Sequence, residues 1–328
     1  MKNKFRILIA DDFEKSLMEG LNQDHCEFVY SPEINRQQIL ETLHSFDGLV
    51  IRSKTRIDAE ILDAGKKLIF IARGGSGMDN IDTIYAEQKN ILCFNAGEAN
   101  SIAVGEHTLG ILLSLLHRIT KSNIEVKNHL WLREENRGVE LSGKTVGIIG
   151  LGNTGSAFAK FLSGFNVTML AYDKHKSNYG NSYIKESTPE EIFENADILS
   201  LHIPLTSETR NLITENYIQQ FKKPFLFLNT SRGEIVNTGD VLAALKNHKI
   251  IGYGADVLEK ENFALYSDEE IKLFNQLSSL ENVVLTPHIA GWTKESYSRI
   301  STVLASKINA ITQKWKLGSF EVLELLKN

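Results

Sequence analysis

The sequence is poor in cysteine, with two residues, Cys26 and Cys93, in a chain of 328. They lie far apart and lack the spacing of a metal site, so a disulfide framework and a zinc centre are both disfavoured, and no metal is expected. Thiols without sequence partners are typical of a reducing compartment.

Long apolar runs and an excess of basic charge are lacking too. The most apolar stretch, residues 109–116, is bounded by His107 and His117 and is too short to span a bilayer. The first apolar run, residues 7–10, is too short for the core of a signal peptide, so we expect a cytoplasmic protein without a membrane partner. The net charge is −5, and with no long basic run we expect no nucleic acid partner.

Short apolar runs instead alternate with amphipathic helical stretches, which predicts βαβ units, mostly parallel sheets and, from the length, two domains. Strands are expected at residues 7–10, 27–30, 48–52, 68–73, 91–94, 145–149, 167–173, 198–202, 225–229, 251–257 and 283–286. Helices are expected at residues 35–44, 99–119, 156–163 and 293–316, the second of them as one long helix.

A glycine-rich loop connects the expected strand 145–149 to the helix after it. Its glycines, Gly150, Gly152 and Gly155, have the spacing of a dinucleotide-binding turn, with room for a pyrophosphate at the helix N-terminus. Asp173 ends the next strand, where a carboxylate accepts hydrogen bonds from the adenosine ribose and repels a 2′-phosphate. These features predict NAD as the cofactor, although Lys174 and Lys176 leave NADP open.

Six segments, taken together and in order, resemble the D-isomer-specific 2-hydroxyacid dehydrogenase family. They are GSGMDNID (75–82), GLGNTG (150–155), HIPLT (202–206), NTSRG (229–233), DVLEKE (256–261) and TPHIAG (286–291). The resemblance implies an α/β fold with a Rossmann NAD-binding domain, residues 99–291, inserted into a flavodoxin-like α/β substrate domain, residues 1–98 plus 292–328. The late position of the glycine loop agrees with such an insertion.

The resemblance also implies a set of cofactor contacts and a set of substrate contacts. The cofactor contacts are Ser76, Gly150, Gly152, Asn153, Thr154, Gly155, Asp173, His202, Ile203, Pro204, Thr230, Ser231, Asp256 and Gly291. The substrate contacts are Arg52, Ser53, Arg73, Gly75, Ser76, Gly77 and Asn80.

Three residues are the expected catalytic groups. Arg232 follows a strand, where a guanidinium can grip a substrate carboxylate with paired hydrogen bonds. His288 also follows a strand, and an imidazole titrates near neutral pH, which suits a proton donor and acceptor. Taken singly, each is more often a structural residue; it is their motif positions that select them. The resemblance selects Glu261, rather than Glu259, as the partner of His288.

The substrate is expected to be a small anionic 2-hydroxy or 2-keto acid. Successive N–H groups in the turn 74–77 make a concavity that suits a carboxylate, with Asn80 in support. Arg52 and Arg73 end strands of the same domain, and two cations there suit a phosphate. Within the family the chain most resembles the D-3-phosphoglycerate dehydrogenases, which have arginines at these positions, and the resemblance implies 3-phosphohydroxypyruvate as substrate and a role in serine biosynthesis. We expect the chain to lack the C-terminal regulatory domain that some of them carry.

Alternatives stay open. One is a glyoxylate/hydroxypyruvate reductase or a D-lactate dehydrogenase; another, of a different class, is an NAD-sensing binding protein similar to the corepressors of this fold. Asn262, where the family often has proline, predicts a looser loop beside Glu261, and Trp292 predicts a narrower pocket. A homodimer is expected, with an interface from the helix 99–119 and the stretch around Trp131.

Overall fold

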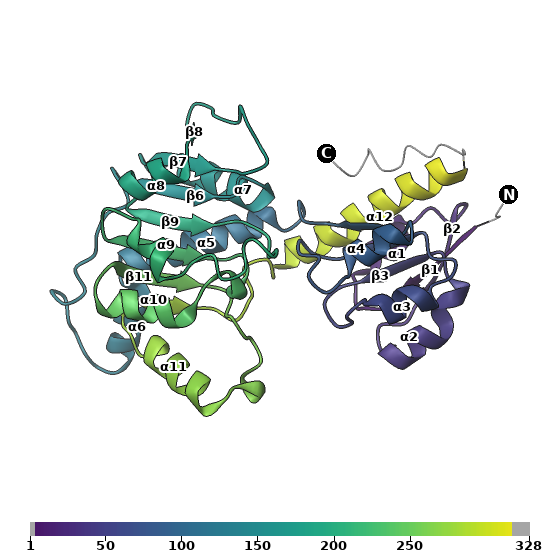
Figure 1. The fold of residues 1–328 in the computed structure, drawn as a ribbon, viewed down its shortest axis with the longest axis horizontal. Helices are drawn as coiled ribbons and strands as arrows, with labels where there is room; N and C mark the ends of the chain where they lie inside the picture. The colour runs from purple at the N-terminus through teal and green to yellow at the C-terminus, as the bar shows by residue number, and fades with distance from the viewer. Residues whose placement is uncertain (1–3, 317–328) are drawn as a thin grey trace. The chain divides into compact units, whose positions relative to one another are not determined.

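The computed structural model describes residues 4–316 and divides into two compact units. The first unit contains the chain up to Asn100 together with the chain from Trp292 onward, and the second is Ser101–Gly291. Figure 1 shows a sheet covered by helices in each unit.

The first unit has a five-stranded parallel sheet in the order β2-β1-β3-β4-β5, the order of flavodoxin-like folds. Its strands are β1 (Phe5–Ile9), β2 (Cys26–Tyr30), β3 (Gly48–Ile51), β4 (Phe70–Arg73) and β5 (Leu92–Asn95). Its α-helices are α1 (Lys15–Gly20), α2 (Arg36–Thr42), α3 (Ala59–Ala64), α4 (Thr83–Gln88) and α12 (Lys294–Lys316), with a 3₁₀ turn at Leu43–Ser45.

The central strands β3 and β4 are buried on both faces, which is why they are apolar runs in the sequence. Ile7 and Ile9 pack with α1 and with Leu304 of α12 on one face, whereas Leu8 packs with Ile61 of α3 on the other. The two separate pieces of the chain thus build one core.

The second unit has a seven-stranded parallel sheet in the order β12-β11-β10-β9-β6-β7-β8. Its strands are β6 (Thr145–Ile149), β7 (Thr168–Tyr172), β8 (Lys185–Glu186), β9 (Ile198–Leu201), β10 (Phe225–Asn229), β11 (Ile250–Ala255) and β12 (Val283–Leu285). Its α-helices are α5 (Ser101–Leu116), α6 (Ile119–Lys127), α7 (Asn153–Leu162), α8 (Pro189–Asn195), α9 (Glu215–Gln219), α10 (Thr238–Lys246) and α11 (Asp268–Ser278), with 3₁₀ turns at Gly233–Ile235 and Phe263–Leu265.

The strand order of the second unit reverses between β6 and β9, as in a doubly wound Rossmann sheet. Ile148 packs toward α5 and α7 on one face, and Ile149 packs toward α8 to α11 on the other. Ligands of such sheets bind beyond the carboxyl ends of the strands, at the reversal point. The predicted fold class, a Rossmann unit inserted into a flavodoxin-like unit, is confirmed.

The long helix expected at residues 99–119 is wrong in one respect. α5 ends at Leu116, and α6 begins at Ile119 after Arg118 takes a left-handed conformation with φ of 52°. No single helix within residues 4–316 has the length and apolarity to cross a membrane; α5 and α6 reach that threshold only as a pair bent by 64°. No group of three metal-binding side chains occurs in this range either.

Candidate active site

The glycine loop lies at the carboxyl end of β6, at the reversal point of the second sheet. Gly150 has φ of +91°, and a Cβ on it would lie 2.4 Å from the carbonyl oxygen of His202. A Cβ on Gly155 would lie 2.1 Å from the Gly150 carbonyl oxygen. Both positions therefore require glycine, and the close approach seats α7 against the strand end.

The start of α7 is open to an anion. No side chain caps the helix, whose N-cap residue is Gly152, and a Cβ on Gly152 would meet nothing within 4 Å. Uncapped N–H groups at the positive end of a helix, with free space before them, fit the pyrophosphate of a dinucleotide. Asn153 and Thr154 form the first turn of this helix.

Asp173 holds the loop in place. Its carboxylate accepts from the backbone N–H of Leu151 at 2.8 Å and from that of His175 at 2.9 Å. Lys174 pairs with Glu208, and Lys176 donates to the Leu151 carbonyl oxygen at 2.7 Å. The two lysines that left NADP open are thus engaged with the protein itself.

His202 lies beneath this loop and not in it. Its side chain is buried, with Nε2 2.9 Å from Ser200 Oγ and the ring 5.4 Å from that of Phe158. Burial without a charged partner lowers the pKa of His202 to about 3, so the ring is neutral. Because the side chain of His202 is buried, only its backbone atoms could make the cofactor contact that the resemblance implies. Ile203 is partly exposed and Pro204 is exposed.

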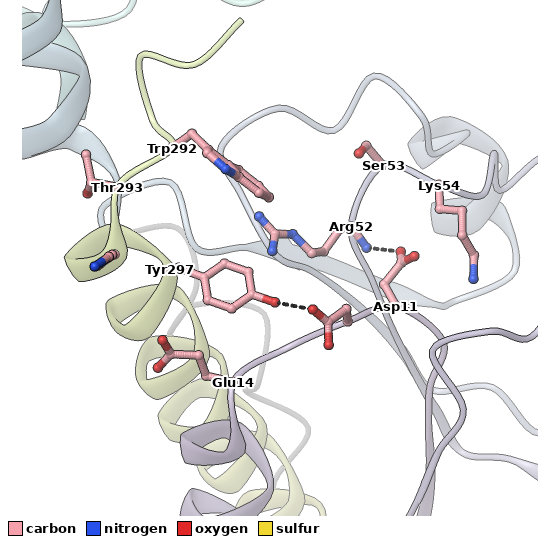
Figure 2. A pocket seen from close by; sticks show the side chains of 10 residues that line it. Asp11, Glu14, Arg52, Ser53, Lys54, Trp292, Thr293 and Tyr297 are labelled. Atoms are coloured by element: carbon pink, nitrogen blue, oxygen red, sulfur yellow. Dashed lines mark hydrogen bonds between the residues drawn. The ribbon is translucent and has the colours of Figure 1, made fainter.

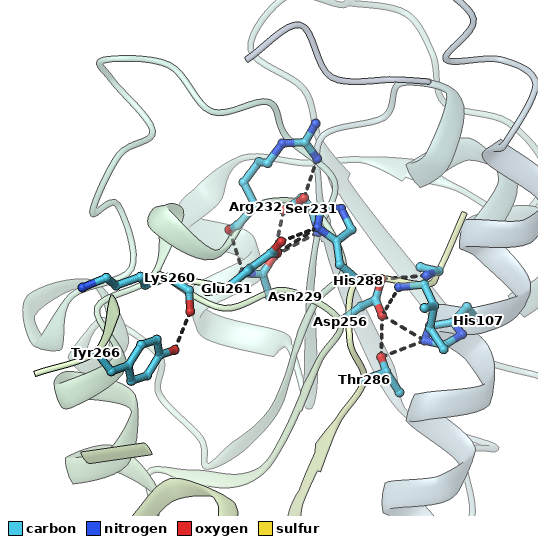
Figure 3. Close-up of polar contacts among 12 residues, drawn as sticks. His107, Asn229, Ser231, Arg232, Asp256, Lys260, Glu261, Tyr266, Thr286 and His288 are labelled. Atoms are coloured by element: carbon cyan, nitrogen blue, oxygen red, sulfur yellow. Dashed lines mark hydrogen bonds and ion pairs between the residues drawn. The ribbon is translucent and has the colours of Figure 1, made fainter. Parts of the chain in front are cut away.

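Three further loops meet the carboxyl edge after β10, β11 and β12, which are neighbours in the sheet. Figure 3 shows Arg232, Glu261 and His288 on these loops, one on each. The turn that carries Arg232 is shaped by the buried Asn229, which accepts from Ser231 N–H at 3.1 Å and donates to the Arg232 carbonyl oxygen at 2.9 Å. Arg232 itself donates to the Ser231 carbonyl oxygen at 2.7 Å.

Glu261 and His288 form a hydrogen-bonded pair. Nδ1 of His288 lies 2.8 Å from Oε1 and 2.9 Å from Oε2 of Glu261. Because an ionised carboxylate only accepts, Nδ1 carries the hydrogen, and Nε2 is left to exchange a proton. Glu259, the rival candidate, instead accepts from the N–H and hydroxyl of Thr238, at 3.1 and 2.7 Å.

Asp256 fixes the loop on which His288 lies. The carboxylate accepts from Thr286 Oγ1 at 2.5 Å, from Ile289 N–H at 2.9 Å and from Ala290 N–H at 2.7 Å. Burial alone would raise the pKa of Asp256, but the hydrogen bonds, led by that from His107, outweigh it and hold the pKa below its usual value. His288 lies between Thr286 and Ile289, both of which bond Asp256, and has a φ of 56°. This left-handed backbone conformation is unfavourable for a residue other than glycine and persists only where the surrounding contacts enforce it.

Two side chains near the site were not foreseen. His107, on α5, places Nε2 2.9 Å from Thr286 Oγ1 and 3.5 Å from Asp256 Oδ1. The buried Thr108 bonds the Thr230 hydroxyl at 2.9 Å. Their only signal in the sequence was a histidine and a threonine interrupting an apolar helix, which does not by itself indicate a site.

The loop after Glu261, for which the sequence predicts a looser conformation, is held by several contacts. Asn262 accepts from the N–H of Ala264 at 3.1 Å and so caps the 3₁₀ turn that follows. The Tyr266 hydroxyl donates to the Lys260 carbonyl oxygen, and Lys260 pairs with Glu270 at 3.1 Å.

In the first unit, Arg52 follows β3 and Arg73 ends β4, on either side of a glycine turn. A Cβ on Gly74 would lie 3.2 Å from Arg52 Cγ, and one on Gly75 would lie 2.0 Å from Arg73 Nη1. Both arginines therefore pack against this turn. Gly77, two residues on, is partly exposed, and Ser53 is exposed.

Asn80 and Ser76 make mostly internal bonds in this unit. The Asn80 amide donates to the carbonyl oxygens of Arg52 and Thr55, both at 2.9 Å, and so supports the Arg52 segment from behind. The Ser76 hydroxyl donates to Asn100 Oδ1 at 2.5 Å.

Comparison with known proteins agrees with this arrangement. The family model of the D-isomer specific 2-hydroxyacid dehydrogenase, NAD binding domain, matches residues 109–290. Hydroxypyruvate reductase of Thermotoga maritima is 33% identical over 93% of this chain and 97% of its own length. D-3-phosphoglycerate dehydrogenase of Bacillus subtilis is 32% identical over 93% of this chain, which spans only 56% of that enzyme.

A solved structure extends the likeness of the fold to almost the whole chain. D-lactate dehydrogenase of Aquifex aeolicus, in complex with NAD and lactic acid, has a TM-score of 0.80 at 24% identity, over 97% of this chain and 99% of that one. The chain therefore belongs to the D-isomer-specific 2-hydroxyacid dehydrogenases, a family of NAD-dependent oxidoreductases.

Proposed function

We propose that this protein interconverts 3-phosphohydroxypyruvate and D-3-phosphoglycerate, a reaction that would serve serine biosynthesis. The observation that carries the proposal is the pair of arginines, Arg52 and Arg73, packed against the Gly74–Gly75 turn. The N–H groups of Gly74 and Gly75 donate to the carbonyl oxygens of Ile51 and Arg73, so a substrate carboxylate is proposed to bind further along the turn, at Ser76 and Gly77. A guanidinium suits a phosphate, and Arg73 places its own directly against Gly75. In this proposal the first unit is the substrate domain and the second is the NAD-binding domain.

Arg232, Glu261 and His288 are the proposed catalytic residues. Arg232 binds the substrate carboxylate and polarises the neighbouring carbonyl. Glu261 holds the Nδ1–H of His288, so that Nε2 delivers a proton to the substrate oxygen during reduction and removes it during oxidation. NAD, held by the glycine loop and Asp173, supplies the hydride chemistry when bound.

A substrate panel tests the proposal. NADH oxidation is followed with phosphohydroxypyruvate, hydroxypyruvate, glyoxylate and pyruvate, in the wild type and in Arg73→Ala. The variant should raise KM for phosphohydroxypyruvate far more than KM for hydroxypyruvate, because only phosphohydroxypyruvate has a phosphate group for Arg73 to bind. Equal effects on both substrates would refute the phosphate assignment. Arg56→Ala, at an exposed arginine of the same unit, is the matched control.

The second candidate is hydroxypyruvate reduction, supported by the Thermotoga maritima enzyme, whose length this chain spans almost entirely. The same panel separates the two, since this candidate requires hydroxypyruvate to be the better substrate. NADH binding without turnover of any 2-keto acid would instead favour an NAD-sensing protein.

We further propose a homodimer. The apolar side of α5 is largely used within the second unit, where Ile111, Leu112 and Leu116 are buried. α6 and the segment after it expose a set of apolar side chains, namely Ile119, Ile124, Val126, Leu130, Trp131, Leu132 and Val139. Such a concentration of exposed apolar residues marks a contact surface. Light scattering of the wild type and of Trp131→Glu tests it, with a monomeric wild type at micromolar concentration as the contrary result.

A further inference from the structure

A pocket of about 550 Å³ lies within the first unit (Figure 2). Three segments line it: Asp11 to Glu14 after β1, Arg52 to Lys54 after β3, and Trp292 to Tyr297 at the start of α12. β1 and β3 are neighbours in the sheet, so their carboxyl ends place the first two segments side by side. Arg52 thus lies in the wall of an open pocket, opposite the start of α12.

Two aromatic rings hold the Arg52 guanidinium. Its carbon lies 4.7 Å from the centroid of the Trp292 ring and 4.6 Å from that of Tyr297, and the two rings contact each other edge-on at 5.9 Å. Within residues 4–316, no carboxylate lies within 4.0 Å of the guanidinium nitrogens. Because the two ring centroids are only 5.9 Å apart, the rings meet the guanidinium from adjacent sides and do not sandwich it. The sides that they leave uncovered can bind an anion.

The clamp is itself fixed. The Tyr297 hydroxyl donates to Asp12 at 2.9 Å, and the other oxygen of Asp12 accepts from Tyr30 at 2.7 Å. Burial, together with the bond to Asp12, raises the pKa of Tyr297 to about 12, so the hydroxyl remains a donor at neutral pH. The backbone N–H of Arg52 donates to the buried Asp11. Arg52 is therefore oriented through both its backbone and its side chain.

We propose that Trp292 and Tyr297 are positioning residues that set substrate specificity by fixing the plane of the Arg52 guanidinium. A fixed N–H edge pairs well with the oxygens of a phosphate and poorly with a neutral hydroxymethyl group, which leaves donors unpaired. The clamp thus selects 2-keto acids that carry a second anion at C3. This inference rests on the proposed function, because it assigns the far end of the same substrate.

The test compares variants that remove a ring with variants that keep one. Trp292→Leu and Tyr297→Leu each remove a ring from Arg52, whereas Trp292→Phe keeps a ring and is the matched control. Tyr297→Phe keeps the ring but loses the bond to Asp12, and so tests that bond separately. The readout is the ratio of kcat/KM for phosphohydroxypyruvate to that for hydroxypyruvate, with KM and kcat separated. Each leucine variant should lower the ratio roughly tenfold or more through KM, Trp292→Phe should retain most of it, and Tyr297→Phe should lie between the two.

A double-mutant cycle with Arg52→Lys separates positioning from simple loss of pocket shape. Lysine keeps the charge but has no plane to fix, so Trp292→Leu should lower the ratio much less in the Arg52→Lys background than in the wild type. Equal losses in both backgrounds would overturn the clamp. A wild type that prefers phosphohydroxypyruvate, with leucine variants that keep the preference, would overturn the clamp and leave the proposed function standing. A wild type without that preference would overturn the proposed substrate and the clamp with it.

Discussion

The buried His202 makes the stability of the second unit sensitive to acid. Its ring contacts Phe158 and Ser200, and burial lowers its pKa to about 3, whereas an imidazole in an unfolded chain titrates near pH 6.5. Below pH 6.5 the unfolded chain therefore binds a proton that the native fold refuses. The free energy of unfolding must fall as pH falls, by ~1.4 kcal/mol per pH unit, until the native pKa is reached.

Between pH 7.5 and pH 5.0 this single group should remove about 2 kcal/mol from the free energy of unfolding. His202→Gln removes the titration and keeps an amide that can bond Ser200. The variant should therefore lose about 2 kcal/mol less than the wild type over the same interval. Urea unfolding at both pH values, followed by circular dichroism, measures the difference.

His117→Gln is the control, since it removes an exposed imidazole from the same unit. It shows how much the substitution itself changes the pH dependence. Identical pH dependence in the wild type and in His202→Gln would refute the reasoning, because it would mean that the buried ring takes up its proton as readily in the native fold as in the unfolded chain.

Two other predictions follow from the site. Glu261→Gln should lower kcat for reduction roughly 10²-fold or more with little change in KM, because the amide no longer fixes the proton-transferring form of His288. A kcat whose value and pH profile are the same in the variant as in the wild type would contradict the pairing. Gly155→Ala should lower the melting temperature, since its Cβ would lie 2.1 Å from a backbone oxygen, whereas Gly152→Ala should keep the melting temperature and weaken NADH binding. Calorimetry and NADH fluorescence titration check this pair, and a Gly152→Ala variant that binds NADH normally would argue against the phosphate position.

Apart from β8 (Lys185–Glu186), a short exposed strand that the sequence analysis did not predict, the strands within residues 4–316 could be located from the sequence, because the central strands of both parallel sheets are buried on both faces. Ile148 and Ile149, adjacent in β6, serve opposite cores, so the strand is apolar at every position. The bend at Arg118, where α5 ends and α6 begins, could not be located, because neither glycine nor proline marks it. α6 buries no side chain and therefore has no apolar stripe to recognise.

The contacts among the residues of the site were harder to predict from the sequence than the strands. Glu261 and His288 are 27 residues apart along the chain, and nothing in their spacing distinguishes Glu261 from Glu259; that choice depended on the resemblance. The interactions of Asp256 with His107 and with backbone N–H groups could not be read from the sequence either. Such contacts depend on where loops from different strands meet, which residue patterns along one segment do not encode.

The insertion of one unit into the other has a consequence for biosynthesis. The core of the first unit needs α12, whose Ile300, Leu304 and Ile308 cover Ile7 and Ile9 of the first strand. During translation that strand emerges before the second unit, and its covering helix emerges after it. At roughly 5–20 residues per second, the first hundred residues wait on the order of ten seconds or more with an apolar sheet face uncovered. The nascent chain is thus most in need of a chaperone while its second unit, contiguous from Ser101 to Gly291, is already free to fold.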